Sequence, residues 1–265
     1  MSYENILIED VDGVRIITMN RPERLNAWTH QMGGEMRVAV EAANEDEDIF
    51  GIVVTGAGRG FCAGADIEAV FKAQADGSAD QEGPSMGDWV SLMRDSKPIV
   101  AAINGAAVGV GLTQVLPMDY LIASESAKLS VRFVKMGLVP ELASSHFLMA
   151  RMGWGQASEL MLTGKTVMAE EAKELGLVDK VVSSNELIES ACNLAREMGN
   201  NPLSALKHIK ALITVNASEA DLKEVQKREL AALELCYASA EHHEAIDAFM
   251  NKREPDFKKA RASQE

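Results

Sequence analysis

Glu141 is the acidic residue of this sequence whose surroundings best suit proton transfer. It follows Pro140 in the segment GLVPELASSH (137–146) and has no basic side chain among its immediate neighbours. Burial among apolar side chains would raise the pKa of this carboxyl group, whereas a helix N-terminus would lower it and commonly carries acids. From the residues alone, Glu141 is either a catalytic carboxylate or an acid favoured near the start of a helix.

Two glycine-rich segments are the second feature that could take part in catalysis or binding. They are GAGRGFCAGAD (56–66) and NGAAVGVGLTQ (104–114). Neither has the G-x-G-x-x-G spacing of a dinucleotide site, so we expect no nicotinamide or flavin. Both could simply be tight turns that need positive φ. Side by side, however, the free N–H groups at two helix starts could hold one oxygen between them, which is an oxyanion hole.

Composition excludes several functional classes. The 265 residues are 47% hydrophobic and carry a formal net charge of −14, a field that repels nucleic acid and anionic membranes. No apolar run approaches the roughly 20 residues that span a bilayer. The three cysteines lack metal-ligand or pairing patterns, so we expect no structural zinc and a reducing compartment. With no export signal visible at the acidic N-terminus, we expect a cytoplasmic protein.

The elements that would position these residues follow from hydrophobic periodicity. The pattern predicts an α/β body, because an apolar strand, a glycine turn and a helix occur twice in succession. Asp12-Gly13 indicates a hairpin, and a polar loop is expected over 76–88. Strands are predicted over 5–10, 13–20 and 49–56, and helices from Leu25 onward, from close to Ala65, and over 185–198, 202–215 and 218–249.

Six segments together resemble the crotonase superfamily, the enoyl-CoA hydratase/isomerase family of acyl-CoA enzymes. The resemblance covers nearly the whole chain, in order and spacing. Its segments are MNRPERLNAW (19–28), GAGRGFCAGADI (56–67), KPIVAAINGAAVGVGL (97–112), GLVPELASS (137–145), LTGKTVMAEEAKELGLVDKVV (162–182) and AIDAFMNKREPDFK (245–258).

The resemblance implies a fold and a set of partners. The expected fold is a spiral of ββα units over residues 1–197, followed by a helical trimerisation region over 198–265. The expected assembly is a homo-oligomer, either a trimer or a hexamer made of two trimers. The substrate would be an acyl-CoA thioester of fatty acid metabolism. No separate cofactor or metal is expected, since coenzyme A is part of the substrate.

The resemblance also assigns roles to residues. The thioester oxygen would lie between the backbone N–H groups of Ala65 and Val110, although the family commonly has glycine at the second position. From its type alone, Asp66 also suits support of a turn. The positions matching the substrate and coenzyme surface are Arg24, Leu25, Ala63, Asp66, Ile67 and Gly109, with Lys252 near the phosphates.

The carboxylates select the reaction. Counting along the family pattern places Thr113 and Phe133 where the resembling hydratases carry their two glutamates, and neither can act as a carboxylate. Isomerases of the superfamily often carry a single acid in the PE…SS region, which here is Glu141. The resemblance therefore implies isomerisation of 3-enoyl-CoA to 2-enoyl-CoA with Glu141 as the proton shuttle. A 2-enoyl-CoA hydratase with atypical water activation and a non-catalytic acyl-CoA-binding protein remain as alternatives.

Other reactive side chains fit structural roles better. Cys62 lies beside the first glycine turn, but its place between Phe61 and Ala63 favours packing over nucleophilic chemistry. The histidines have no triad or metal-ligand pattern. His146, five residues beyond Glu141, could line the same pocket.

Overall fold

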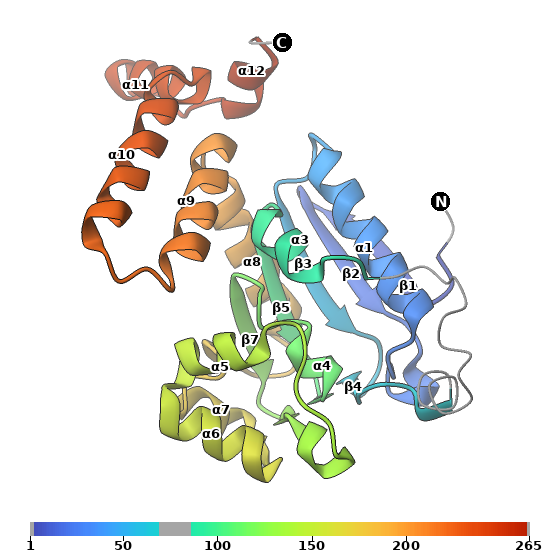
Figure 1. Ribbon diagram of the computed structural model, residues 1–265. Coiled ribbons are helices and arrows are strands. Elements are labelled where there is room, and N and C mark those ends of the chain that lie inside the picture. The colour runs from blue at the N-terminus through green and yellow to red at the C-terminus, as the bar shows by residue number, and fades with distance from the viewer. Residues whose placement is uncertain (1–2, 69–85, 264–265) are drawn as a thin grey trace.

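Two β-sheets and the helices around them form the structure (Figure 1). The computed structural model describes residues 3–68 and 86–263. In spatial order, the larger sheet contains β1 (Ile6–Val11), β2 (Val14–Met19), β3 (Gly51–Gly56), β5 (Ile99–Ile103), β7 (Tyr120–Ser124) and β10 (Lys180–Val182). The smaller sheet contains β4 (Gly60–Cys62), β6 (Ala106–Val108), β8 (Lys128–Ser130) and β9 (Thr166–Met168).

The chain alternates between the two sheets. The pairs β3/β4, β5/β6 and β7/β8 each place their first strand in the larger sheet and their second in the smaller one. Neighbouring strands of these pairs are parallel, so each passage of the chain advances one strand in both sheets. The α/β prediction, with its spiral of repeated units, is confirmed.

Helices follow or flank these strands. The first half of the chain contributes η1 (Pro22–Arg24), α1 (His30–Glu45), α3 (Trp89–Asp95) and α4 (Val110–Thr113). The middle contributes η3 (Arg132–Met136), α5 (Ser144–Met152), α6 (Trp154–Thr163) and α7 (Ala169–Glu174). The last part contributes α8 (Leu187–Gly199), α9 (Leu203–Asn216), α10 (Leu222–Tyr237), α11 (Ala240–Asn251) and α12 (Phe257–Ala262).

Alternation of side chains explains why the larger sheet is buried on both faces. In β3, Ile52 and Val54 join the main core, whereas Val53 joins the cluster on the opposite face. Helix α8 covers that opposite face with Ala191 and Cys192. A strand covered on both sides must be apolar throughout, which is why this segment reads as a continuous apolar run.

The hairpin at Asp12-Gly13 is confirmed. Strands β1 and β2 pair antiparallel, with Val11 opposite Val14. The two turn residues have φ values of 47° and 78°, as a tight hairpin turn of the favoured hand requires.

The helix predicted from Leu25 begins later, at His30. Thr29 caps it by accepting a hydrogen bond from the N–H of Met32 at 3.1 Å. Upstream, Leu25 and Asn26 have positive φ, and the buried Asn26 amide donates to the carbonyl groups of Ala57 and Gly60. The spacing of apolar residues could not show this later start, because residues 25–29 are held by hydrogen bonds to distant parts of the chain rather than by helical ones.

The helix predicted close to Ala65 is only partly visible. Ala65 itself forms an extended bridge with Trp28, and a helical turn begins at Ile67. The later residues of the predicted helix and most of the predicted loop over 76–88 lie outside the described residues.

The last part of the chain is helical, as predicted, but the stretch over 218–249 is two helices. Ser239 interrupts it and caps α11 by accepting from the N–H of His242 at 3.1 Å. Helices α10 to α12 extend away from the sheets, at the top of Figure 1. The predicted division at residues 197/198 and the role of the later part in oligomerisation stay predictions. Within the described ranges, no helix is both long and apolar enough to cross a membrane.

Candidate active site

The two glycine turns pack directly against each other. A Cβ atom placed on Gly111 would lie 2.1 Å from the carbonyl oxygen of Cys62, and one on Gly64 would lie 3.3 Å from that of Val108. Gly64 and Gly109 also have positive φ, of 109° and 55°. Glycine is therefore required here both for close approach and for backbone conformation. The side-by-side placement inferred from the sequence is what the structure has.

The backbone of each turn leaves one N–H directed away from its neighbours. The bridge to Trp28 uses the carbonyl of Gly64 and the N–H of Asp66, both at 2.8 Å, so the N–H of Ala65 points to the opposite side. Val110 is the first residue of α4, and the first N–H groups of a helix have no partner within it. Both residues line one pocket. This arrangement can hold an anionic oxygen between two donors.

The pocket has a volume of about 650 Å³ and a mixed lining. Its apolar wall is formed by Phe133, Met136, Leu138 and Leu142. The predicted site residues Ala63, Ala65, Ile67, Gly109, Val110, Phe133 and Glu141 all line it. The structure thus brings together predicted residues from three distant parts of the sequence, 63–67, 109–110 and 133–141.

Glu141 lines this pocket, and Thr113, which is fully buried and does not line it, holds its carboxylate. The Thr113 hydroxyl donates a hydrogen bond of 2.7 Å to Oε1 of Glu141. Helix α5 begins only at Ser144 and has no acidic residue in its first turn. The helix-start interpretation of Glu141 is therefore wrong, since its carboxylate faces Thr113 and lies outside that helix.

Partial burial of the carboxyl group raises the pKa of Glu141. Glu141 as a whole residue is exposed, but its hydrogen bond with Thr113 is half-buried. Loss of solvation is the largest cause of the upward pKa shift, and the hydrogen bond from Thr113 opposes it. Val139 takes no part in this enclosure, because it is 82% exposed. A raised pKa keeps a carboxylate basic enough to accept a proton and acidic enough to return it.

Unusual backbone follows Glu141. Leu142 and Ala143 both have positive φ, of 57° and 54°, a conformation that costs non-glycine residues energy. Ser144 then donates from its N–H, at 3.1 Å, and from its hydroxyl to the carbonyl of Glu141. These bonds fix the loop that carries the carboxylate.

Four of the residues predicted for substrate and coenzyme binding, Arg24, Leu25, Asp66 and Lys252, are not among those that line the pocket. Arg24 and Leu25 lie beside the first glycine turn, where the Leu25 carbonyl accepts from the N–H of Ala63 at 3.0 Å. The carboxylate of Asp66 pairs with Arg21 at 2.9 Å, which suits support of the turn. Lys252 follows the end of α11 and is not among the residues that line the pocket.

Several lining residues were not selected from the sequence. They include Trp28, His30, Met86, Val108, Arg132, Lys135 and Met136. The sequence did contain one indication that Trp28 belongs to the site, since Trp28 ends a segment that matches the family pattern. Its indole Nε1 is buried and has no acceptor within the described part of the chain. Arg132 and Lys135 make the rim basic despite the negative net charge of the chain.

Cys62 and His146, the other reactive side chains considered from the sequence, do not line the pocket of Glu141. Burial raises the pKa of the Cys62 thiol to about 11, so the group stays protonated and packs in the core. His146 lines a different hollow, between α5 and α9, and the expectation that it shares the Glu141 pocket is wrong.

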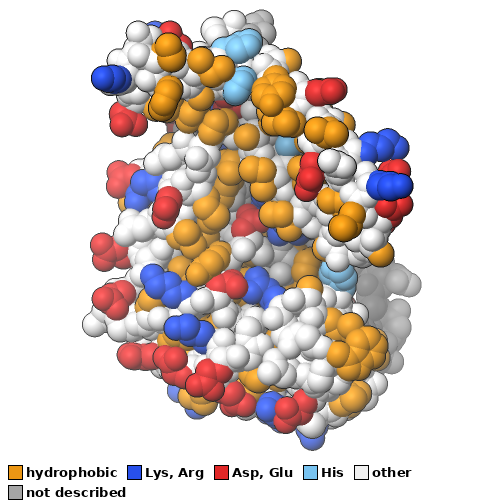
Figure 2. All heavy atoms as spheres, turned by 90° about the vertical axis from the view of Figure 1, so that its left-hand side faces the viewer, with side chains coloured by type: hydrophobic (Ala, Val, Ile, Leu, Met, Phe, Trp, Pro, Cys, Tyr) orange, Lys and Arg blue, Asp and Glu red, His pale blue; other side chains and the backbone are white. Residues whose placement is uncertain are grey.

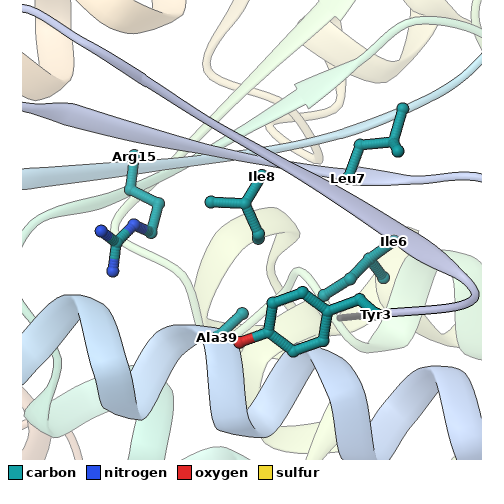
Figure 3. Close-up of a pocket in the computed structure, with 6 residues that line it drawn as sticks. All are labelled: Tyr3, Ile6, Leu7, Ile8, Arg15 and Ala39. Carbon is teal, nitrogen blue, oxygen red and sulfur yellow. The ribbon is translucent and has the colours of Figure 1, made fainter. Parts of the chain in front are cut away.

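A third hollow lies between β1 and α1 (Figure 3). It is lined by Tyr3, Ile6, Leu7, Ile8, Arg15 and Ala39. Arg15, its one charged lining group, is already paired with Asp10 at 2.8 Å and Asp46 at 3.0 Å. The charge of this hollow is therefore already compensated, and among its described lining residues the phenol of Tyr3 is the remaining polar side chain.

Comparison with known proteins identifies relatives over the whole chain. The family model described as Enoyl-CoA hydratase/isomerase matches residues 9–260. The 1,2-epoxyphenylacetyl-CoA isomerase of Escherichia coli is 34% identical, covering 96% of this chain and 98% of its own. A protein of Mycobacterium bovis named as a probable enoyl-CoA hydratase is 35% identical, covering 97% and 99%. The crystal structure of an enoyl-CoA hydratase from Polaromonas sp. JS666 superimposes with a TM-score of 0.86 at 28% identity, covering 95% and 98%.

The contact between the glycine turns yields a stability prediction. Gly111→Ala places a Cβ against the carbonyl of Cys62, so the turns must separate, and we expect the free energy of unfolding to fall by about 1–3 kcal/mol. Gly155→Ala in α6 is the matched control, because a Cβ there meets nothing within 4 Å. Urea denaturation measures both variants. Equal stability of the two would contradict the close contact.

Proposed function

Because this chain belongs to the enoyl-CoA hydratase/isomerase family, we propose that it isomerises 3-enoyl-CoA to 2-enoyl-CoA thioesters with Glu141 as the proton shuttle. One observation carries the proposal. Among the described residues lining the pocket, Glu141 is the one carboxylate, and that pocket also contains the two backbone donors.

The reaction needs one base and one oxyanion site. Glu141 removes a proton from C2, and the electrons move onto the thioester oxygen as a dienolate. The N–H groups of Ala65 and Val110 stabilise the negative charge on that oxygen. Glu141 then returns the proton to C4, which leaves the double bond between C2 and C3. No metal or separate cofactor is required by these steps.

The neighbours of Glu141 support isomerisation over hydration. The Thr113 hydroxyl donates a hydrogen bond to Glu141, and Phe133 lines the pocket with an aromatic ring. Neither group is a second carboxylate that could hold and activate water. Hydration by Glu141 alone is the second candidate, and the name of the mycobacterial relative favours it.

The lining also supports a class of substrate. Phe133, Met136 and Leu138 suit an apolar acyl chain, and Arg132 and Lys135 suit the phosphates of coenzyme A. We therefore propose a fatty acyl-CoA thioester as substrate. The cysteine pattern, which favours a reducing compartment, supports the separate proposal of a cytoplasmic location.

Glu141→Gln tests the proposed role of the carboxylate. We expect the rate of 3-enoyl-CoA isomerisation to fall by at least about 100-fold, because an amide cannot accept the C2 proton. Glu189→Gln, the same change at an exposed site on α8, should leave the rate unchanged. Each variant is incubated with 3-enoyl-CoA and with 2-enoyl-CoA, and the products are separated by chromatography.

The same assay separates the competing functions. Hydration of 2-enoyl-CoA without conversion of 3-enoyl-CoA would establish the hydratase instead. Tight acyl-CoA binding without turnover of either substrate would establish a binding protein. A wild-type isomerisation rate in Glu141→Gln would remove Glu141 from the mechanism.

The raised pKa of Glu141 predicts a pH dependence. The base must be ionised in the free enzyme, so kcat/KM should fall as the pH falls through the pKa of this group. Because partial burial shifts that pKa upward, the midpoint of the acid limb should lie above the ordinary value of 4.5. A pH series of kcat/KM measures it, and an acid limb centred below 4.5 would contradict the assignment.

Exposed apolar side chains support an oligomer. Leu222, Phe249 and Met250 are 77%, 83% and 73% exposed. Figure 2 shows hydrophobic side chains across the upper part of the molecule and down into a hollow below it. Residues of α5 and α9 line a hollow of about 650 Å³. We propose that these surfaces meet other copies of the chain in a trimer or a dimer of trimers.

Phe249→Asp tests the oligomer. If Phe249 is buried between copies in the assembly, a charge there should weaken the contact and shift the molecular mass measured by light scattering towards that of one chain. Leu7→Asp, at an apolar side chain that is 54% exposed on β1, should leave the mass unchanged. A wild-type protein that is monomeric at micromolar concentration would contradict the proposal.

A further inference from the structure

Thr113 has a buried hydroxyl whose direction bears on the chemistry of Glu141. The residue is fully buried on α4, and its backbone N–H bonds to the carbonyl of Gly109 at 3.0 Å. A buried hydroxyl is costly unless it is hydrogen-bonded, and Oε1 of Glu141 accepts a hydrogen bond from it, with 2.7 Å between the two oxygens. Valine would fill nearly the same volume without needing a partner. The hydroxyl is thus explained by Glu141, not by packing.

Helix α4 links this hydroxyl to the proposed oxyanion site. Val110 begins the helix and Thr113 is its last residue. Three helical steps separate them, which is roughly 5 Å along the axis. The backbone contact of Gly111 with Cys62 fixes the helix against the first turn. One short rigid element therefore sets both the donor for the thioester oxygen and the group that holds the carboxylate.

The hydrogen bond distinguishes the two oxygens of the carboxylate. A threonine hydroxyl has one hydrogen to donate, and here Oε1 of Glu141 accepts it. While Oε1 accepts this hydrogen bond, Oε1 is a poorer acceptor than Oε2 for a proton from the substrate. Oε2 is not engaged by Thr113. We propose that Thr113 is a positioning residue whose hydroxyl holds Oε1 of Glu141, so that Oε2 both removes the C2 proton and returns it at C4.

This inference rests on the proposed isomerisation, in which one proton leaves C2 and the same proton reaches C4. The C2–H bond breaks, its electron pair enters the dienolate and its proton forms a bond with Oε2. The Oε2–H bond then breaks, the proton joins C4 and the dienolate electrons form the C4–H bond. Because one oxygen performs both transfers, the carboxyl group need not rotate between them.

Thr113→Val is the direct test. The variant keeps the volume of the side chain but removes the donor, so Glu141 loses its fixed orientation. We expect kcat for 3-enoyl-CoA to fall by roughly 10- to 100-fold with little change in KM. The midpoint of the acid limb of kcat/KM should move to higher pH, since the bond to the charged form is lost. Thr113→Ser restores the donor and should recover the rate to within a few-fold, and Thr113→Ala serves as a smaller second variant if valine disturbs folding.

Titration of Glu141 in the ligand-free protein separates this inference from the proposed function. Glutamate is labelled with ¹³C at the side-chain carboxyl carbon, and the signal missing in Glu141→Gln is assigned to Glu141. A higher pKa in Thr113→Val and Thr113→Ala than in wild type and Thr113→Ser would support the positioning role, even if 3-enoyl-CoA is not isomerised. An unchanged pKa together with an unchanged pH–rate profile would overturn it.

Discussion

The candidate active site depends on a backbone contact that leaves no room for a side-chain carbon. Gly111 approaches the carbonyl of Cys62, and Gly64 approaches that of Val108. Any larger residue at Gly111 would push α4 away from the turn that carries Ala65. The distance between the two candidate N–H donors is therefore set by packed backbone rather than by flexible side chains. Such preorganised donors lose little energy to rearrangement when charge develops on a bound oxygen.

The loop that carries Glu141 is held at an energetic cost. Leu142 and Ala143 both adopt positive φ, and non-glycine residues in this region cost of order 1–3 kcal/mol each. The bonds from Ser144 to the carbonyl of Glu141 and from Thr113 to its carboxylate oppose that cost. Backbone strain persists only where surrounding contacts over-determine it. Here the contacts converge on the one residue that the proposed reaction needs to hold still.

Some of this arrangement could be predicted from the sequence, and some could not. Alternating β-branched residues around Asp12-Gly13 specify the hairpin locally, and glycine spacing identifies both turns. The late start of α1 depends on Asn26 bonding to carbonyls more than 30 residues away, which no local pattern contains. The direction of the Glu141 side chain depends on Thr113, 28 residues earlier in the chain. Trp28 and His30 enter the pocket for the same reason, because tertiary packing brings them there.

The residue type at position 113 changes the charge balance of the pocket. By the resemblance, the hydratases carry one of their two water-activating glutamates at this position and the other at the position of Phe133. With threonine there, the neighbour of Glu141 is a neutral donor that favours its charged form. The pocket then has one carboxylate to move one proton, in place of two acids sharing a water. A hydroxyl donor 2.7 Å from Oε1 of Glu141, in place of a second carboxylate, is thus what supports the proposed isomerisation over hydration.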